Sequence, residues 1–218
     1  MSKIVNPFSH RLGIIRDWRA RWFAVPKKIK DSLRPDILIR EYLEKRLRGL
    51  YVAYVLIERR QNFLRLIINT SRPGAVIGRS GEGMTKLKSD LLKFMRRQNI
   101  MPTGEFKIDV VEVPQPETNA AIASYMIAEG LEKRLHFRRV IKQMMDKIIA
   151  NRNVKGARIG VYGRLDGAEI ARSEEIKKGS IPLQTFRADV DFARERAHLP
   201  YGDIGIKVWI YKGEVFNK

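Results

Sequence analysis

Four glycines fall within ten residues, at Gly74, Gly78, Gly81 and Gly83, and a periodic basic segment follows them directly. Glycine adopts positive φ angles at little cost and lets another backbone come close. Apolar residues then recur at three- and four-residue steps through residues 84–94, which predicts an amphipathic helix. A tight bend of this kind before a helix leaves backbone N–H groups at its N-terminus, where an anion is stabilised.

The segments on either side of this loop predict one small α+β module. Residues 36–47 carry apolar side chains at helical spacing, and Pro35 marks the expected start of that helix. Residues 51–58 and 63–70 are rich in β-forming side chains, with a charged loop between them that predicts a hairpin. Residues 105–113 alternate apolar and polar side chains, as in a half-buried strand. The expected order is therefore helix, strand, strand, glycine loop, helix, strand.

The remaining chain predicts an arm and a second module. Residues 1–34 form an expected basic arm, whose Trp18 and Trp22 we expect to dock on a partner because tryptophan is costly to expose to water. The proline pair in 114–117 marks an expected boundary. Helices are predicted for 117–135 and 137–152, and strands for 157–163, 183–193 and 205–213. The fold class expected for the whole chain is α+β.

The charge balance favours a polyanionic partner. The 218 residues include 43 Lys and Arg against 24 Asp and Glu, a formal net charge of +19. Nucleic acid is the first candidate and an anionic membrane the second. Cysteine is absent from the sequence, which excludes disulfides, cysteine zinc sites and a thiol nucleophile. Apolar runs are far shorter than the about 18 residues that a membrane-spanning helix needs. We expect a cytoplasmic protein, with an organellar transit peptide in residues 1–30 as the alternative.

The loop Gly78-Arg79-Ser80-Gly81 is the first candidate site. Its backbone N–H groups and the Arg79 guanidinium suit a phosphodiester. The loop lacks the Lys-Ser or Lys-Thr pair of a Walker loop and the pattern of a dinucleotide fingerprint, so it gives no support for an ATP or NAD site. A plain turn with a helix cap explains the spacing equally well when it is taken alone.

Together with the element order, the loop resembles that of a type II KH domain, which clamps about four nucleotides of single-stranded RNA. The blocks "SRPG", "FRRVIKQ", "GRLDGAEIAR", "PLQTFRADVDFA" and "YGDIGIKVWIYKGE" resemble, in order, the universal family of the third protein of the bacterial-type small ribosomal subunit. The resemblance implies a type II KH RNA-binding domain over 35–113 and a C-terminal α+β ribosomal domain over 114–218. The family loop commonly carries two lysines, whereas this chain has Arg79 and Ser80.

A second basic cluster lies on the helix predicted for 137–152. Its expected buried face consists of Val140, Ile141, Met144, Met145, Ile148 and Ile149. Arg138, Arg139 and Lys142 then fall within an exposed arc of roughly 100°. Such an arc suits a phosphate chain, although an ordinary solvated basic face has the same pattern. The family resemblance implies that these three residues line the mouth of the messenger RNA channel and help to open messenger duplexes passively.

The resemblance also implies the partners. They are ribosomal RNA of the subunit head, messenger RNA, small-subunit proteins ten and fourteen in the head, and proteins four and five at the channel mouth. No cofactor is implied. Additional RNA contacts are expected at six basic residues: Arg11, Arg72, Lys133, Arg134, Arg164 and Arg172.

Two other functions stay open. A free-standing regulator could bind single-stranded RNA through the KH-like module. A metal-dependent nuclease could use Glu169 with Asp189 and Asp191, which alternate onto one strand face. Ion pairing with the arginines at 187, 194 and 196 explains the same carboxylates. The three histidines show no ligand spacing. We therefore expect a structural RNA-binding protein with no catalytic or metal site.

Overall fold

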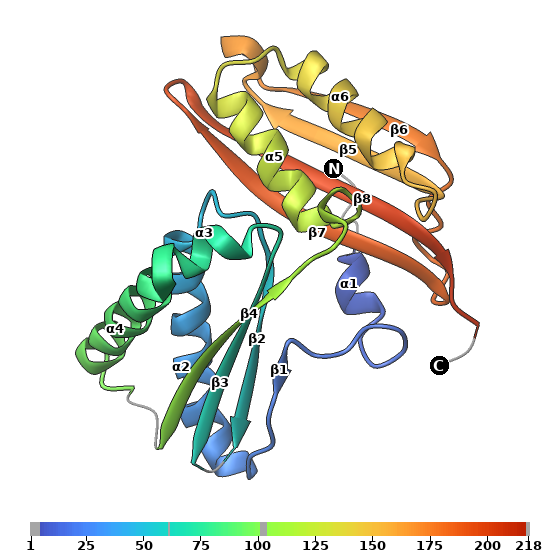
Figure 1. Ribbon diagram of the computed structural model, residues 1–218. Helices are drawn as coiled ribbons and strands as arrows, with labels where there is room; N and C mark the ends of the chain where they lie inside the picture. Colours follow the sequence, from blue (N-terminus) through green and yellow to red (C-terminus); the bar gives the residue numbers. More distant parts are fainter. Residues whose placement is uncertain (1–4, 61, 101–103, 217–218) are drawn as a thin grey trace. The chain divides into compact units, whose positions relative to one another are not determined.

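Figure 1 shows the computed structural model, which describes residues 5–60, 62–100 and 104–216 apart from the Lys28 side chain. The chain divides into two compact units. One consists of residues 19–114, and the other joins the segment before Arg19 to the chain from Gln115 onward. The residues expected to form a separate arm, 1–34, are therefore divided between the two units.

The unit 19–114 is a four-stranded sheet with helices packed against it (Figure 1). Its strands are β1 Ala20–Arg21, β2 Val52–Arg60, β3 Phe63–Thr70 and β4 Glu105–Glu112, in the spatial order β1-β2-β3-β4. Its helices are α2 Pro26–Arg46, α3 Pro73–Ile77 and α4 Glu82–Arg97, with the 3-10 turn η1 Arg79–Gly81. The β2–β3 hairpin is confirmed, and β3 pairs in parallel with β4. The predicted element order is confirmed, with β1 and α3 added.

One face of this sheet carries the core of the unit. Ile57 of β2 and Leu66 of β3 point to the same side and are fully buried, as are Leu43 of α2 and Leu91 of α4. Side chains alternate between the two faces of a strand, so only every second residue joins this cluster. Packing of α2 and α4 on this face fixes where the loop between α3 and α4 lies.

Helix α2 begins at Pro26, so the prediction of a start at Pro35 is wrong. Pro26 suits the first turn of a helix because the backbone N–H that it lacks has no partner there. Pro35 lies inside the helix and removes one backbone hydrogen bond. Leu33 is 46% exposed, whereas Ile39 is fully buried. The sequence pattern therefore marks the point where the helix meets the core, not the point where it starts.

The second unit is an antiparallel sheet with two long helices. Its strands are β5 Gly156–Gly163, β6 Arg172–Gly179, β7 Ala188–Leu199 and β8 Gly202–Glu214, in the order β6-β5-β8-β7. Its helices are α1 Pro7–His10, α5 Ala120–Glu132 and α6 Phe137–Ala150, with 3-10 turns η2 Pro116–Thr118 and η3 Leu165–Gly167. β6 was not predicted, because Ile176 is its one apolar residue and the strand lies at the sheet edge.

The two faces of this second sheet are packed differently. One face buries Ile159, Val208 and their neighbours in the main core with α5 and α6. On the other face, Trp209 forms a smaller cluster with Val190 and with side chains of the loop before β7. The strand predicted for 183–193 begins only at Ala188, because the residues ahead of it form this loop.

Arg11 ties the N-terminal segment to that loop. Its side chain is fully buried. The guanidinium donates hydrogen bonds of 2.6–3.2 Å to five carbonyl oxygens, those of Pro7, Pro182, Leu183, Thr185 and Ala188. Burial lowers the pKa of Arg11, and the nearby Asp189 carboxylate opposes that shift. No guanidinium surface is left for a phosphate, so the expected RNA contact at Arg11 is corrected to a structural role.

Candidate nucleic-acid interface

The glycine loop is a tight turn between α3 and α4. Gly78 has φ +74° and Gly81 has φ +81°, both in a region that side-chain-bearing residues avoid. Ser80 also has a positive φ, of +52°. Arg79 and Ser80 are exposed, and no acidic side chain in the described part of the chain pairs with Arg79. The loop therefore presents backbone and one free cation to an incoming anion.

Gly83 is required for a different reason. A Cβ atom there would lie 2.7 Å from the carbonyl oxygen of Val76 and 2.8 Å from that of Ile77. At Gly78 it would lie 2.9 Å from the backbone nitrogen of Gly83. The first turn of α4 is thus pressed directly against the end of α3, and only glycine leaves room for this contact.

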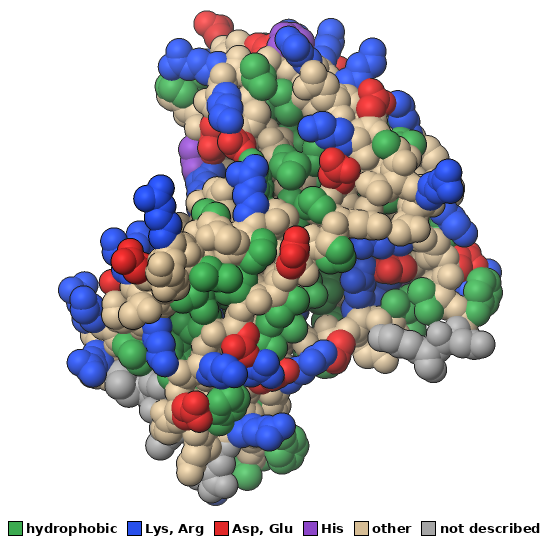
Figure 2. All heavy atoms as spheres, viewed as in Figure 1, with side chains coloured by type: hydrophobic (Ala, Val, Ile, Leu, Met, Phe, Trp, Pro, Cys, Tyr) green, Lys and Arg blue, Asp and Glu red, His purple; other side chains and the backbone are tan. Residues whose placement is uncertain are grey.

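Basic side chains continue from the loop along α4. Lys86, Lys93 and Arg97 are exposed on the helix, and its buried side is formed by Leu87, Leu91 and Met95. Figure 2 shows Lys and Arg side chains along the edge that α4 occupies in Figure 1. The loop and α4 together form one cationic strip. Arg72, beside this strip, stacks its guanidinium 4.3 Å from the centroid of the Tyr51 ring.

Helix α6 of the second unit carries the other predicted cluster. Its expected buried face is confirmed for five residues, whereas Ile149 is only partly buried. Arg139 and Lys142 are exposed, and neither has an acidic partner among the described residues. Arg138 is also exposed, but it forms an ion pair with Glu174 of β6, with its Nε 2.9 Å from Oε1. We call Arg138, Arg139 and Lys142 the α6 cations.

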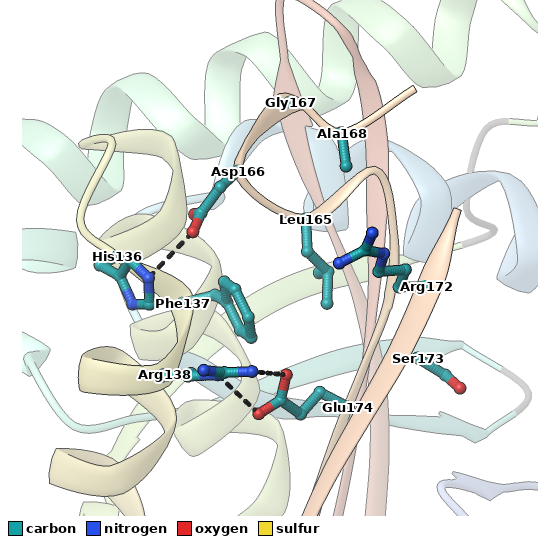
Figure 3. Close-up of a pocket in the computed structure, with 10 residues that line it drawn as sticks. All are labelled: His136, Phe137, Arg138, Leu165, Asp166, Gly167, Ala168, Arg172, Ser173 and Glu174. Carbon is teal, nitrogen blue, oxygen red and sulfur yellow. Dashed lines mark hydrogen bonds and ion pairs between the residues drawn. The ribbon is translucent and has the colours of Figure 1, made fainter. Parts of the chain in front are cut away.

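A pocket of about 510 Å³ lies beside Arg138 (Figure 3). Phe137 lies between the Arg138–Glu174 pair and a second pair, in which His136 Nε2 is 3.0 Å from Asp166 Oδ2. The imidazole of His136 stacks on the Phe137 ring at 5.0 Å between centroids. Arg172 lines the opposite wall. The pocket was not predicted, although the segment 163–174 that forms this wall belongs to a block noted in the sequence.

The remaining predicted RNA contacts have mixed surroundings. Lys133 pairs with Glu129, with Nζ 2.6 Å from Oε1. Arg134 is exposed, with a φ of +58° just after α5. Arg164 donates to the carbonyl oxygens of its own loop at Ala168 and of Tyr201, so its guanidinium is partly used to fix that loop.

The two aspartates considered for a nuclease have structural partners. Asp189 pairs with Arg16 at 2.5 Å. Asp191 is buried and accepts a hydrogen bond from the backbone N–H of Ala120 at the start of α5. Arg187, one of the three arginines expected to pair with these aspartates, pairs with Glu214 instead. No group of metal-ligand residues occurs within the described ranges. None of the helices in those ranges is both long and apolar enough to cross a bilayer.

Comparisons with known proteins agree with this division. Residues 38–118 match the KH domain family, and residues 127–210 match the family described as ribosomal protein S3, C-terminal domain. The small ribosomal subunit protein uS3 of Clostridium novyi is 41% identical over 99% of this chain and 94% of its own length. That of Synechocystis is 41% identical over 99% of this chain and 87% of its own length.

A KH domain with an exposed GxxG loop, followed by a second basic α/β unit, defines an RNA-binding protein of the ribosomal type. The match to both domains and the identity over nearly the whole length make the assignment specific. The chain belongs to the uS3 family of small ribosomal subunit proteins. This is a family of ribosomal constituents and not of enzymes, which removes the nuclease alternative.

Proposed function

We propose that this protein is a structural constituent of the small ribosomal subunit head, binds ribosomal RNA, and uses the α6 cations to hold incoming messenger RNA. The observation that carries the proposal is the arrangement on α6. Its buried side is fully occupied by the core, and its outer side presents three cations, of which Arg139 and Lys142 have no acidic partner in the described chain. The cytoplasmic ribosome is the proposed location.

The same arrangement supports a passive mechanism of strand opening. A helix surface that neutralises several phosphates gains free energy from counterion release, whatever the base sequence. The α6 cations would hold the backbone of a separated strand and thereby make its re-pairing less favourable. No ATP-binding loop is needed for this, because movement of the messenger by the translating ribosome supplies the work.

The strip formed by the glycine loop and α4 would supply the second contact. Its exposed backbone and Arg79 suit the backbone of ribosomal RNA, with the KH domain as the supporting scaffold. Small-subunit proteins ten and fourteen would be neighbours in the head, and proteins four and five would complete the channel mouth. Trp18 and Phe23, which are 62% and 96% exposed, are apolar side chains suited to contacts with such neighbours.

The test is a full-length triple variant, Arg138→Ala with Arg139→Ala and Lys142→Ala, assembled into small subunits. Translation is measured on two messengers that differ only in whether a stable hairpin lies downstream of the start codon. We expect the variant to translate the structured messenger severalfold more slowly than wild type does, and the unstructured messenger at nearly the wild-type rate. The matched control is Arg152→Ala with Lys155→Ala and Lys212→Ala, which removes the same charge from other positions of the unit.

Two outcomes would refute the proposal. Equal slowing on both messengers would exclude strand opening by the α6 cations. Sedimentation of the wild-type protein away from small subunits would instead support the free-standing regulator, because a constituent of the subunit must sediment with it in stoichiometric amount.

A further inference from the structure

We infer that the sheet of the second unit carries another RNA-binding surface, on the face opposite α5 and α6. It consists of five cations on four strands: Lys177 of β6, Arg158 of β5, Lys207 of β8, and Arg194 and Arg196 of β7. We call this set the basic sheet face. It is an interaction surface for the sugar-phosphate backbone of RNA, and it shares no residue with the α6 cations or with the glycine loop.

The strand register places these cations on one side. Arg158 is directly opposite Lys177 on one neighbouring strand and Trp209 on the other. Directly opposed residues in an antiparallel pair point to the same face. Lys207 is opposite Arg194 in the same way. Since Val208 and Ile210 belong to the core under the helices, Lys207 and Trp209 must point away from those helices.

Positive charge dominates this face. The register places two acidic side chains on this face: Glu175, opposite Gly160, and Asp203 of β8, opposite His198. The Glu175 carboxylate accepts hydrogen bonds from Tyr162 and Arg158, and Asp203 Oδ1 lies 2.7 Å from His198 Nδ1. Burial opposes the charge of Glu175, yet these two hydrogen bonds lower the pKa of its carboxyl, so it stays ionised. Lys177, Arg194 and Arg196 are exposed. Five cations against two carboxylates therefore leave an excess of positive charge for an outside anion.

Ring contacts hold two of these cations close to the sheet. The Arg158 guanidinium carbon lies 4.9 Å from the centroid of Trp209, and Lys207 Nζ lies 4.8 Å from that of Tyr162. Tyr162 itself covers Gly160, where a Cβ would come within 2.6 Å of the phenolic oxygen. A cation held in this way loses less conformational entropy when it meets a phosphate than a lysine on a free stem would.

The side chains also indicate which polyanion fits. Membrane docking requires apolar side chains that insert into the lipid surface. Trp209 is only 1% exposed, so it cannot insert in this way. The same burial removes it as a platform for base stacking. The face therefore suits contacts to phosphates without base reading. RNA as the polyanion rests on the proposed function, because the family is ribosomal.

The geometry gives the second unit positive surfaces on both sides of one sheet. The α6 cations lie on the helix layer, and the basic sheet face lies on the uncovered part of the other side. The Trp209 cluster and the loop before β7 cover the rest of that side. Such a unit can be held between two RNA segments, one fixed and one moving.

The test compares two full-length variants. The first is Lys177→Ala with Arg194→Ala and Lys207→Ala, and the control is the Arg152, Lys155 and Lys212 triple-alanine variant described above. Affinity is measured by fluorescence anisotropy across a salt series, with a poly(U) strand and an RNA hairpin as separate probes. Thermal unfolding verifies that both variants are folded.

We expect the first variant to bind RNA more than tenfold more weakly at low salt. The slope of log affinity against log salt should fall by about 2, because single strands give about 0.7 per phosphate neutralised. An unchanged slope, or equally tight binding of wild type to polyglutamate or anionic vesicles, would overturn the inference. The proposed function is tested by a different experiment, the translation of structured and unstructured messengers by subunits with the α6 cations replaced, so the two can fail independently.

Discussion

The guanidinium of Arg138 meets the carboxylate of Glu174 side by side, with Nε 2.9 Å from Oε1 and Nη2 3.4 Å from Oε2. The pair joins α6 to the edge strand β6 at the rim of the pocket in Figure 3. The Arg138 side chain is 67% exposed. An exposed pair of this kind is worth about 0–1 kcal/mol, so a phosphate can replace the carboxylate.

This relationship predicts that Glu174→Gln strengthens RNA binding. Loss of the carboxylate frees Arg138 and adds one positive charge to the surface of the α6 cations. We expect affinity for single-stranded RNA to rise severalfold at low salt, and the salt slope to steepen by up to about 0.7. Anisotropy titrations at several salt concentrations measure both quantities.

The control for this variant is Glu214→Gln, which releases Arg187 at another position of the same unit. It makes the same change in net charge. An equal gain in RNA affinity for the two variants would show that the effect comes from net charge and not from the release of Arg138. A loss of affinity in Glu174→Gln would show that the carboxylate holds Arg138 in its RNA-binding position.

Two glycines around the loop should respond in opposite ways to alanine. Gly83→Ala forces a Cβ against two backbone carbonyls, so we expect a loss of stability of about 1–3 kcal/mol and a weaker RNA contact. Gly74→Ala meets nothing within 4 Å and should be neutral or stabilising by up to about 1 kcal/mol. Denaturant unfolding of both variants measures this difference. Similar free energies of unfolding for the two would contradict the close packing of α3 against α4.

Arg11→Met should destabilise the second unit. Five carbonyl acceptors lose a donor, at about 0.5–1.5 kcal/mol each, so we expect a loss of about 3 kcal/mol or more. Arg16→Met is the control, since Arg16 forms one partly exposed pair with Asp189. Urea unfolding followed by tryptophan fluorescence reports the change. If Arg11→Met instead lowered RNA affinity at unchanged stability, its structural assignment would be wrong.

The phenol of Tyr162 should lose its proton only at high pH. Burial first, and then the hydrogen bond to Glu175, raise the pKa of its phenol to about 12. The folded state therefore favours the neutral phenol, and this contribution to stability is complete below about pH 10. It is lost as the pH rises towards 12. We expect the free energy of unfolding to fall more steeply over this range in wild type than in Tyr162→Phe. The same dependence of the free energy of unfolding on pH in both proteins would contradict the raised pKa of Tyr162.

The sequence was sufficient to predict the features that depend on local periodicity. The buried face of α6 follows from apolar residues at helical spacing, and the β2–β3 hairpin follows from two β-rich runs close together. The exposed position of the α6 cations follows from the same periodicity. The family blocks then indicated which of the exposed positive charges to propose as functional.

Features that depend on contacts between distant segments could not be predicted. Arg11 has the composition of a surface residue, and its burial depends on carbonyls more than 170 residues away. β6 is polar, so it becomes a strand only because the edge of β5 is available to it. The pocket beside Arg138 likewise requires residues from two separated segments.

The link between Arg11 and Ala188 spans 177 residues of chain. During synthesis the segment that holds Arg11 leaves the ribosome well before its binding partners in the loop ahead of β7. The unit 19–114 contains all of its own strands and helices, so a nascent chain can complete it while the segment before it stays unattached. Attachment of the N-terminal segment therefore has to wait until the loop before β7 has been synthesised.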